Sequence, residues 1–212
     1  MASPERPNIG VIDYGMGNLI SVCNAFQFLG AKTHIIDSPK HCSISDAIVL
    51  PGVGAFGRAM ERLRVLDLIH PLSDAVMGRQ VPFLGICLGM QMLAKSSSEM
   101  GDHAGLGWVN GRVEQIPNSQ NIRVPHVSWN RLAVRKNSKL FSRLKTQDNF
   151  YFDHSYQFTV LSEDIVAYTD YHGAIPAVIE RDNIYGTQFH PEKSQRAGLI
   201  LLRNFLNLVV NH

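Results

Sequence analysis

The chain has 212 residues, 20 of them basic and 18 acidic, and its formal net charge at pH 7 is +2. This length suits one domain with a substantial core, and a composition of 45% hydrophobic and 18% charged residues is typical of a globular protein. The near balance of charge argues against nucleic acid or a membrane surface as the main partner. With three cysteines and no recognisable signal peptide or long apolar span, we expect a cytoplasmic protein.

Short apolar runs alternate with amphipathic stretches through the first half of the chain. The pattern predicts strands at 9–12, 33–36, 47–50 and 81–86, and helices at 19–29, 56–76 and 90–94. Such alternation is typical of a parallel sheet flanked by helices, in which the carboxyl ends of the strands meet at one edge and bind ligands. We therefore expect segments 13–18 and 51–54 to lie near Cys87 at that edge.

The second half of the chain contains more strand patterns. Strands are predicted at 109–116, 150–152, 165–171, 178–181 and 184–189, and a closing helix at 198–208. No repeat, low-complexity tract or linker divides the chain, so we predict a single domain over residues 1–212, with residues 1–7 as a disordered extension. The predicted fold class is α/β, with a mostly parallel central sheet flanked by helices and a strand-rich second half.

The most informative segment is LGICLGMQ, residues 84–91, because it places Cys87 between Gly85 and Gly89 where a strand gives way to a helix. A tight turn of this kind presents its central side chain and strains its backbone, as in the nucleophile elbow of hydrolases. The N-terminus of the following helix favours the thiolate, and the backbone N–H of Leu88 points at an oxyanion formed on an attacked carbonyl. The alternative is a small buried cysteine that is chemically inert.

A thiolate nucleophile needs a base that transfers protons, and His190 is the candidate among nine histidines. It follows a predicted buried strand that Pro191 ends, and Glu192 is spaced to accept a hydrogen bond from the imidazole. Cys87, His190 and Glu192 would then act as nucleophile, base and orienting carboxylate. The alternative is a surface histidine beside an ion-paired glutamate.

The turn PGVG at residues 51–54 is a second candidate site. Its two glycines allow Val53 to present a backbone N–H to a ligand, which would complete an oxyanion hole with Leu88. The alternative is a connection between a strand and a helix whose glycines serve only the geometry of the turn.

Two further segments carry no predicted site. DYGMGN, residues 13–18, lacks the spacing of phosphate-binding loops, so we reject nucleotide binding there. His126 and Trp129, in PHVSWN, are expected to be core or loop-packing residues. No spacing of histidine and cysteine indicates a metal site, and we predict no metal or other cofactor.

The chain resembles the class I glutamine amidotransferases in two segments, LGICLGMQ and FHPEKS, which match the signatures of their Cys-His-Glu glutaminase domain. It is similar, in order and spacing, to the glutaminase subunits of imidazole glycerol phosphate synthase in five more: DYGMGNL, LPGVGAFGRAM, GLGWVNGRVEQIP, VPHVSWNRL and YFDHSYQF. The resemblance implies the amidotransferase fold over nearly the whole chain. It also implies a heterodimer in which glutamine-derived ammonia passes to a (β/α)8-barrel cyclase subunit, which makes imidazole glycerol phosphate and an aminoimidazole carboxamide ribotide in histidine biosynthesis.

The same resemblance implies a role for each matching residue. Cys87 would attack the side-chain amide of glutamine to form a thioester, and His190, oriented by Glu192, would protonate the departing ammonia and then activate water. Leu88 and Val53 would supply the oxyanion N–H groups. The amino-acid end of glutamine would be held by Gln91, His154, Ser155 and Tyr156, and the cyclase would be contacted by Asn18, Tyr151 and Lys193.

Two positions depart from the family pattern. Ser128 replaces a glycine, which restricts the backbone, and Asp153 before His154 adds a carboxylate near the glutamine pocket or the partner face. These departures leave open a paralogue that supplies another synthase, such as one that aminates a sugar. A non-catalytic interaction subunit and a cysteine peptidase or γ-glutamyl hydrolase are competing functions. Lys193 could be a solvated charge and Gln91 a helix-surface amide.

Overall fold

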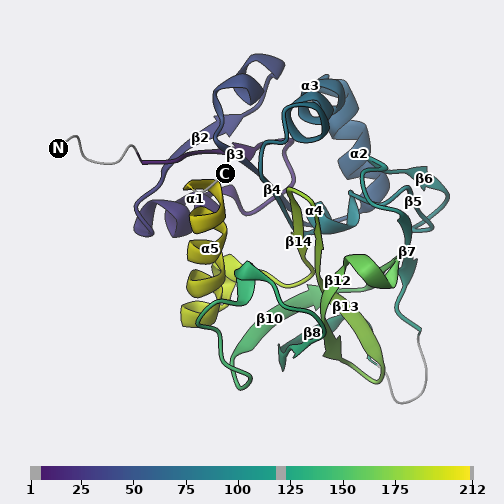
Figure 1. The fold of residues 1–212 in the computed structure, drawn as a ribbon. Helices are drawn as coiled ribbons and strands as arrows, with labels where there is room; N and C mark the ends of the chain where they lie inside the picture. Colours follow the sequence, from purple (N-terminus) through teal and green to yellow (C-terminus); the bar gives the residue numbers. More distant parts are fainter. Residues whose placement is uncertain (1–5, 118–122, 211–212) are drawn as a thin grey trace.

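A computed structural model describes residues 6–117 and 123–210 and is built around one large sheet. Its strands are β1 (Asn8–Ile12), β2 (Lys32–Ile36), β3 (Ala47–Gly52), β4 (Phe83–Cys87), β9 (Ala133–Val134), β12 (Ile165–Asp170), β13 (Ala174–Arg181) and β14 (Ile184–Thr187). They lie in the order β2-β1-β3-β4-β14-β13-β12-β9 (Figure 1). The first five strands in this order are parallel to one another, and the last three, β13, β12 and β9, pair antiparallel. The predicted α/β fold with a mostly parallel central sheet is confirmed.

In these two stretches of chain, five α-helices accompany the sheet. They are α1 (Leu19–Phe28), α2 (Phe56–Val65), α3 (Ile69–Ser73), α4 (Leu88–Gln91) and α5 (Gln195–Val210). Figure 1 shows α1 beside α5 and, away from that pair, α2 beside α3. Short 3-10 turns cover Pro39–Ile44, Lys139–Phe141, Ser162–Asp164 and Pro191–Lys193, and a π-helical turn covers Asp74–Gly78. Within the described residues, no helix combines the length and the apolar content that crossing a bilayer requires.

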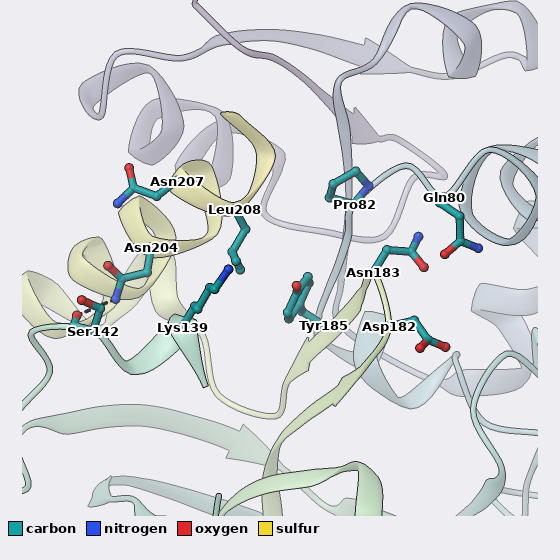
Figure 2. Close-up of a pocket in the computed structure, with 10 residues that line it drawn as sticks. All are labelled: Gln80, Pro82, Lys139, Ser142, Asp182, Asn183, Tyr185, Asn204, Asn207 and Leu208. Atoms are coloured by element: carbon teal, nitrogen blue, oxygen red, sulfur yellow. Dashed lines mark hydrogen bonds between the residues drawn. The ribbon is translucent and has the colours of Figure 1, made fainter. Parts of the chain in front are cut away.

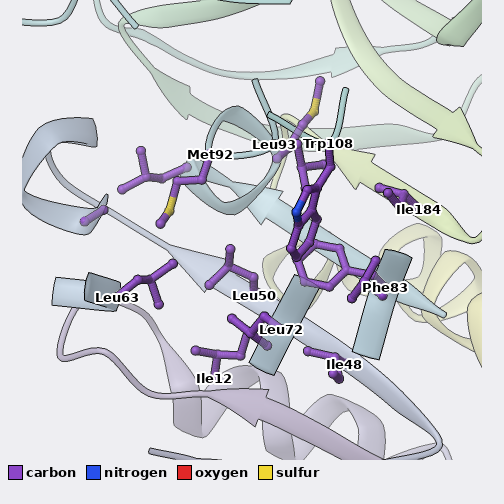
Figure 3. Close-up of a cluster of buried hydrophobic side chains, with 14 of the residues drawn as sticks. Ile12, Ile48, Leu50, Leu63, Leu72, Phe83, Met92, Leu93, Trp108 and Ile184 are labelled. Atoms are coloured by element: carbon purple, nitrogen blue, oxygen red, sulfur yellow. The ribbon is translucent and has the colours of Figure 1, made fainter. Parts of the chain in front are cut away.

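Alternate residues of the parallel strands belong to two separate hydrophobic cores. In β3, Ala47 and Val49 pack with residues of α1 and α5, whereas Ile48 and Leu50 pack with residues of α2 and α3. Figure 3 shows the second core, with Ile48 and Leu50 among side chains that include Leu63 and Trp108. Because both faces of these strands are buried, they appear in the sequence as continuous apolar runs.

Two smaller sheets are built from the second half of the chain and the loop after α4. One pairs β8 (His126–Arg131) with β10 (Asn149–His154), and the other has the order β11-β7-β5-β6, made of β11 (Tyr156–Val160), β7 (Gly111–Gln115), β5 (Ser96–Ser97) and β6 (His103–Ala104). β8 is not among the predicted strands. His126 is fully buried as expected, whereas Trp129 is 45% exposed and so is not a core residue; it lies beside Gln147 and Asp148, in keeping with the alternative of packing against a loop.

The helix predicted over residues 56–76 is interrupted. α2 ends at Val65, and Asp67 adopts a left-handed conformation with φ of 53°. The N–H of Leu68 donates to the Leu63 carbonyl and the N–H of Asp67 donates to the Arg64 carbonyl, which are the hydrogen bonds of a Schellman motif. Leu63 and Leu68 enter the same core, so the apolar periodicity continues across the break and conceals it.

The helix predicted at 90–94 is also different, because α4 is a single turn that ends at Gln91. The carbonyls of residues 92–94 accept hydrogen bonds from backbone N–H groups of residues 106, 107 and 109 instead of continuing the helix. After Cys87 the chain therefore offers the N–H groups of one turn and not the dipole of a long helix.

The two ends of the chain differ in how far the structure describes them. Of the predicted disordered extension at residues 1–7, residues 1–5 lie outside the described part of the chain. The carbonyl of Pro7 accepts a hydrogen bond of 2.9 Å from the N–H of Lys32, next to the first pair of β1 and β2. At the other end, α5 begins at Gln195, three residues before the predicted start at Gly198.

Candidate active site

The carboxyl ends of β3, β4 and β14 bring the predicted catalytic segments together. β3 pairs with β4 up to Gly52 opposite Cys87, so the turn after β3 leaves the sheet beside the cysteine. On the other side of β4, Thr187 of β14 pairs with Ile86, and the chain reaches His190 shortly after that pair. The parallel register therefore places a thiol and an imidazole at one sheet edge although they are distant in sequence.

Cys87 has the strained backbone that a nucleophile elbow requires. Its φ is 54° and its ψ is −109°, a region that residues with side chains rarely adopt. A Cβ atom on Gly85 would lie 2.6 Å from the carbonyl oxygen of Gly89, and one on Gly89 would collide with the carbonyl of Leu50. Both flanking glycines are needed because α4 packs directly against β3 and β4.

His190 and Glu192 form a buried pair behind the cysteine. Nδ1 of His190 lies 2.9 Å from Oε1 of Glu192, and both side chains are almost completely buried. Burial alone lowers the pKa of His190, but hydrogen bonds to Cys87 and Glu192 and their negative charges outweigh it and raise the pKa to about 10. The alternative of a surface histidine beside an ion-paired glutamate does not fit this geometry, which favours an imidazolium next to the sulfur.

Gln188 also contacts the sulfur and is not among the site residues predicted from the sequence. Its Nε2 donates to Sγ of Cys87 at 3.7 Å, and the thiol of Cys87 in turn donates to the carbonyl oxygen of Asp153 at 3.8 Å. Gln188 is fully buried. Strand alternation does not predict this contact, because β14 ends at Thr187 and both Gln188 and His190 follow it outside the strand.

A cavity of about 290 Å³ opens over Cys87. Its lining includes the thiol, the imidazole and all six residues predicted to form the oxyanion hole and to hold glutamine. The residues around it are Val53, Gly54, Cys87, Leu88, Gln91, Glu99, Pro125, Asp153, His154, Ser155, Tyr156 and His190. The structure thus collects predicted site residues from separate segments of the chain around one space.

Hydrogen bonds define what two of these residues can offer a ligand. The Nε2 group of Gln91 donates to the Tyr156 carbonyl at 2.8 Å and to Oε1 of Gln188 at 3.1 Å, so its free capacity is the acceptor Oε1. Gln91 is buried, which contradicts the alternative of a helix-surface amide. Both ring nitrogens of His154 contact protein atoms, the Tyr156 carbonyl and His126, so this residue can bind a ligand only through its main chain.

Glu99 lines the cavity and was missed by the sequence analysis. Its Oε2 accepts a hydrogen bond of 2.7 Å from the N–H of Phe56 at the N-terminus of α2. The residue lies in a polar loop and belongs to no motif, and its partner is 43 positions away, so no local pattern indicates the contact. Glu99 therefore places a carboxylate, which attracts cationic groups, at the end of the cavity next to the start of α2.

The three predicted interface residues lie outside the cavity lining. Nζ of Lys193 is 5.6 Å from the ring centroid of Tyr151, which lies 5.7 Å from the ring centroid of Trp129. Trp129 is 45% exposed and Val127, on the same strand, 51% exposed. Asn18 has a local function, because its side chain accepts a hydrogen bond from the N–H of Ser21 and caps α1.

A larger cavity of about 750 Å³ lies at the opposite ends of β4 and β14 (Figure 2). The amide of Asn183 donates to two backbone carbonyls there, and the amide of Asn204 donates to the carbonyls of Leu140 and Ser142. These side chains hold loops in place. Of the residues that the structure describes, no cysteine or histidine lines this cavity, so it is not the candidate for nucleophilic chemistry.

The fold and the site define the class of the protein. The sequence model of the family described as glutamine amidotransferase class-I matches residues 10–208, so the chain belongs to the class I glutamine amidotransferases. Its curated relatives include two proteins named imidazole glycerol phosphate synthase subunit HisH. The protein from Leptospira interrogans is 41% identical over 94% of this chain and 100% of its own length. The protein from Methanothermobacter thermautotrophicus is 45% identical over 95% and 98%. Within the class, the chain belongs to this HisH family.

Solved structures show the same fold at lower identity. A crystal structure of a glutamine amidotransferase has a TM-score of 0.73 and 21% identity, covering 95% of this chain and 98% of that one. The structure of PurLQS from Thermotoga maritima also has a TM-score of 0.73, with 18% identity, covering 96% of this chain and 99% of that chain. At such identity the likeness concerns the fold alone.

Proposed function

We propose that this chain is the glutaminase subunit of an imidazole glycerol phosphate synthase, in which glutamine is hydrolysed over Cys87 and the ammonia passes to a cyclase subunit. We further propose that one domain over residues 1–212 performs this step. The observation that carries the proposal is the 290 Å³ cavity, because it joins a thiol, an imidazole held by a carboxylate, and polar groups suited to an amino acid.

In the proposed reaction the thiolate of Cys87 attacks the amide carbon of glutamine and a C–S bond forms. The N–H groups of Leu88 and Val53 stabilise the oxyanion. The C–N bond then breaks, and the nitrogen takes the proton of the His190 imidazolium and leaves as ammonia. The neutral His190 next takes a proton from water as that water attacks the thioester, and glutamate leaves as the thiolate is restored. Glu192 orients the ring and stabilises its charged form.

Charge complementarity supports glutamine as the substrate. Its α-ammonium group would face the carboxylate of Glu99 and the free acceptor Oε1 of Gln91. Its α-carboxylate would be bound by main-chain N–H groups of residues 154–156, including Ser155 and Tyr156. This places the amide of the side chain toward the sulfur.

The face formed by Val127, Trp129, Tyr151 and Lys193 is proposed to contact the cyclase. It combines two half-exposed apolar side chains with a cation above an aromatic ring, and aromatic side chains are enriched at protein interfaces. The backbone carbonyl of Tyr151 also accepts a hydrogen bond from the N–H of His190, so this face adjoins the catalytic base. The naming of the curated relatives as synthase subunits supports a cyclase as the partner.

The test uses the Cys87→Ser variant in complex with the cyclase subunit encoded in the same genome. Glutamine-dependent turnover of the cyclase substrate, a ribulosyl-type intermediate of histidine biosynthesis, should be lost, whereas its turnover with ammonium salts should remain. A matched control is Cys23→Ser, which changes a partly exposed cysteine that does not line the cavity. Full glutamine use by Cys87→Ser would refute the mechanism. Glutamine-dependent turnover by the unsubstituted chain only in the presence of a sugar-aminating synthase would assign the other acceptor.

A further inference from the structure

The wall of the cavity opposite the elbow is held at one carbonyl. The oxygen of Tyr156 accepts hydrogen bonds from Nε2 of Gln91 and from Nδ1 of His154, each at 2.8 Å. Gln91 belongs to α4 and His154 ends β10, so two elements meet at this atom. Because Ser155 and Tyr156 line the cavity, the position of this backbone determines the shape of the space for glutamine.

The hydrogen bond from His154 continues into a buried chain of side chains. Nε2 of His154 lies 2.9 Å from Nδ1 of His126, and Nε2 of His126 lies 2.9 Å from Oγ of Ser128. The ring of His126 is stacked between Phe152 and Tyr171, with centroid separations of 4.9 and 3.8 Å. This stacking restricts the ring, so the contacts of its two nitrogens are fixed by the fold.

The direction of each hydrogen bond follows from the Tyr156 carbonyl. A carbonyl only accepts, so Nδ1 of His154 carries the hydrogen, and Nε2 of the neutral ring accepts from Nδ1–H of His126. Nε2 of His126 is then an acceptor as well. Burial lowers the pKa of His154 to about 3 and that of His126 to about 4, in keeping with two neutral rings. The hydroxyl of Ser128 is the donor that completes the chain.

The position of the Ser128 hydroxyl is set from its far side. The hydroxyl donates to Oδ1 of Asn130, whose amide is oriented because its Nδ2 donates to the Asp170 carbonyl at 2.9 Å. A hydroxyl has one hydrogen, so Ser128 serves Asn130 and Nε2 of His126 through a three-centre hydrogen bond. Ser128 lies in the regular strand β8 without a positive φ, so the backbone restriction expected from a serine at this position has no cost here.

We propose that Ser128 is a positioning residue for glutamine binding, which acts by fixing the tautomers of His126 and His154 and thereby the Tyr156 carbonyl in the cavity wall. The proposal rests on the proposed function, because glutamine is the ligand whose cavity is shaped. Ser128 itself is not among the cavity-lining residues, so its effect passes through the two histidines. It gives a role to one of the two departures from the family pattern.

The test measures alkylation of Cys87 by a glutamine analogue, 6-diazo-5-oxo-L-norleucine, in complex with the cyclase subunit. The concentration dependence separates the apparent affinity KI from the limiting rate kinact. Ser128→Ala should raise KI about fivefold, the effect of losing one hydrogen bond, with little change in kinact. Ser128→Thr retains a hydroxyl and should restore KI. Val134→Thr, a size-matched change at an exposed position of β9 that lies outside the cavity lining, should leave it unchanged.

A second readout follows the tautomers directly. Long-range ¹H–¹⁵N spectra of the histidine-labelled chain should show His154 protonated at Nδ1, and the Ser128→Ala variant should show an altered tautomer population at His126 and His154. Unchanged KI, or raised KI with unchanged tautomers, would overturn the positioning role. Absence of labelling at Cys87 in the unmodified complex would instead refute the proposed function, so the two failures are distinguishable.

Discussion

The protonation of His190 is the single property on which the proposed chemistry depends most. Burial opposes its charge, yet hydrogen bonds to Cys87 and Glu192 and their charges raise its pKa from 6.5 to about 10. A raised folded-state pKa stabilises the fold fully below the unfolded value and loses that contribution as pH rises through the folded value. The free energy of unfolding should therefore decline between pH 6.5 and about 10.

The Glu192→Gln variant tests this assignment. It removes the carboxylate but keeps the size of the side chain, so the pKa of His190 should fall and the alkaline decline in stability should become smaller. Glutamine turnover should drop by about a hundredfold or more, as for loss of assisted proton transfer. Urea unfolding at stepped pH and steady-state kinetics measure the two effects. An unchanged pH profile of stability would show that Glu192 does not hold His190 charged.

Single residues of the site were predictable to different degrees. Cys87, His190 and Glu192 could be proposed because each stands in a local motif beside a predicted strand end. Glu99 could not, since it reaches the cavity through a contact with Phe56 that spans 43 positions. The roles of Gln91 and His154 were also incomplete in the sequence, because only the structure shows which of their polar atoms are already used.

Among the elements, α4 depends most on close packing. A Cβ atom on Gly89 would overlap the Leu50 carbonyl of β3, whereas one on Gly78 would have nothing within 4 Å. Gly89→Ala should cost about 1–3 kcal/mol in the free energy of unfolding and should displace Cys87, while Gly78→Ala should be nearly neutral. Urea unfolding of both variants measures the difference. Equal stability of the two would contradict the packing of the elbow against β3.

The elements themselves were predicted well where one physical signal dominated. Strands buried on both faces, such as β3, gave clear apolar runs, and α5 gave a long helical pattern. The pattern failed over residues 56–76 because α2 and α3 bury side chains in one core on both sides of the turn at Asp67. It failed for β8 because that strand alternates exposed and less exposed residues, among them the half-exposed Trp129, and pairs only with β10 among the described strands.

For the molecule as a whole, the sheet edge that carries Cys87 and the face of β8 and β10 adjoin each other. The Trp129→Ala variant should fold normally, because the side chain is 45% exposed, but should weaken binding of the cyclase subunit by about 30-fold or more, as expected for a central tryptophan. Isothermal titration calorimetry measures the affinity. Met77→Ala is the control, since Met77 is 47% exposed and lies just before the opposite ends of the strands. An equal change in affinity for the cyclase subunit in both variants would place the interface elsewhere.

The central claim is that Cys87 forms a covalent bond to the acyl group of glutamine. Rapid acid quenching of the complex during turnover, followed by intact-mass and peptide mass spectrometry, should reveal an adduct with the mass of glutamine less ammonia. The adduct should lie on the peptide that contains Cys87 and should be absent from Cys87→Ser. Glutamine turnover without any such adduct, or with the adduct on Cys23 or Cys42, would contradict the account.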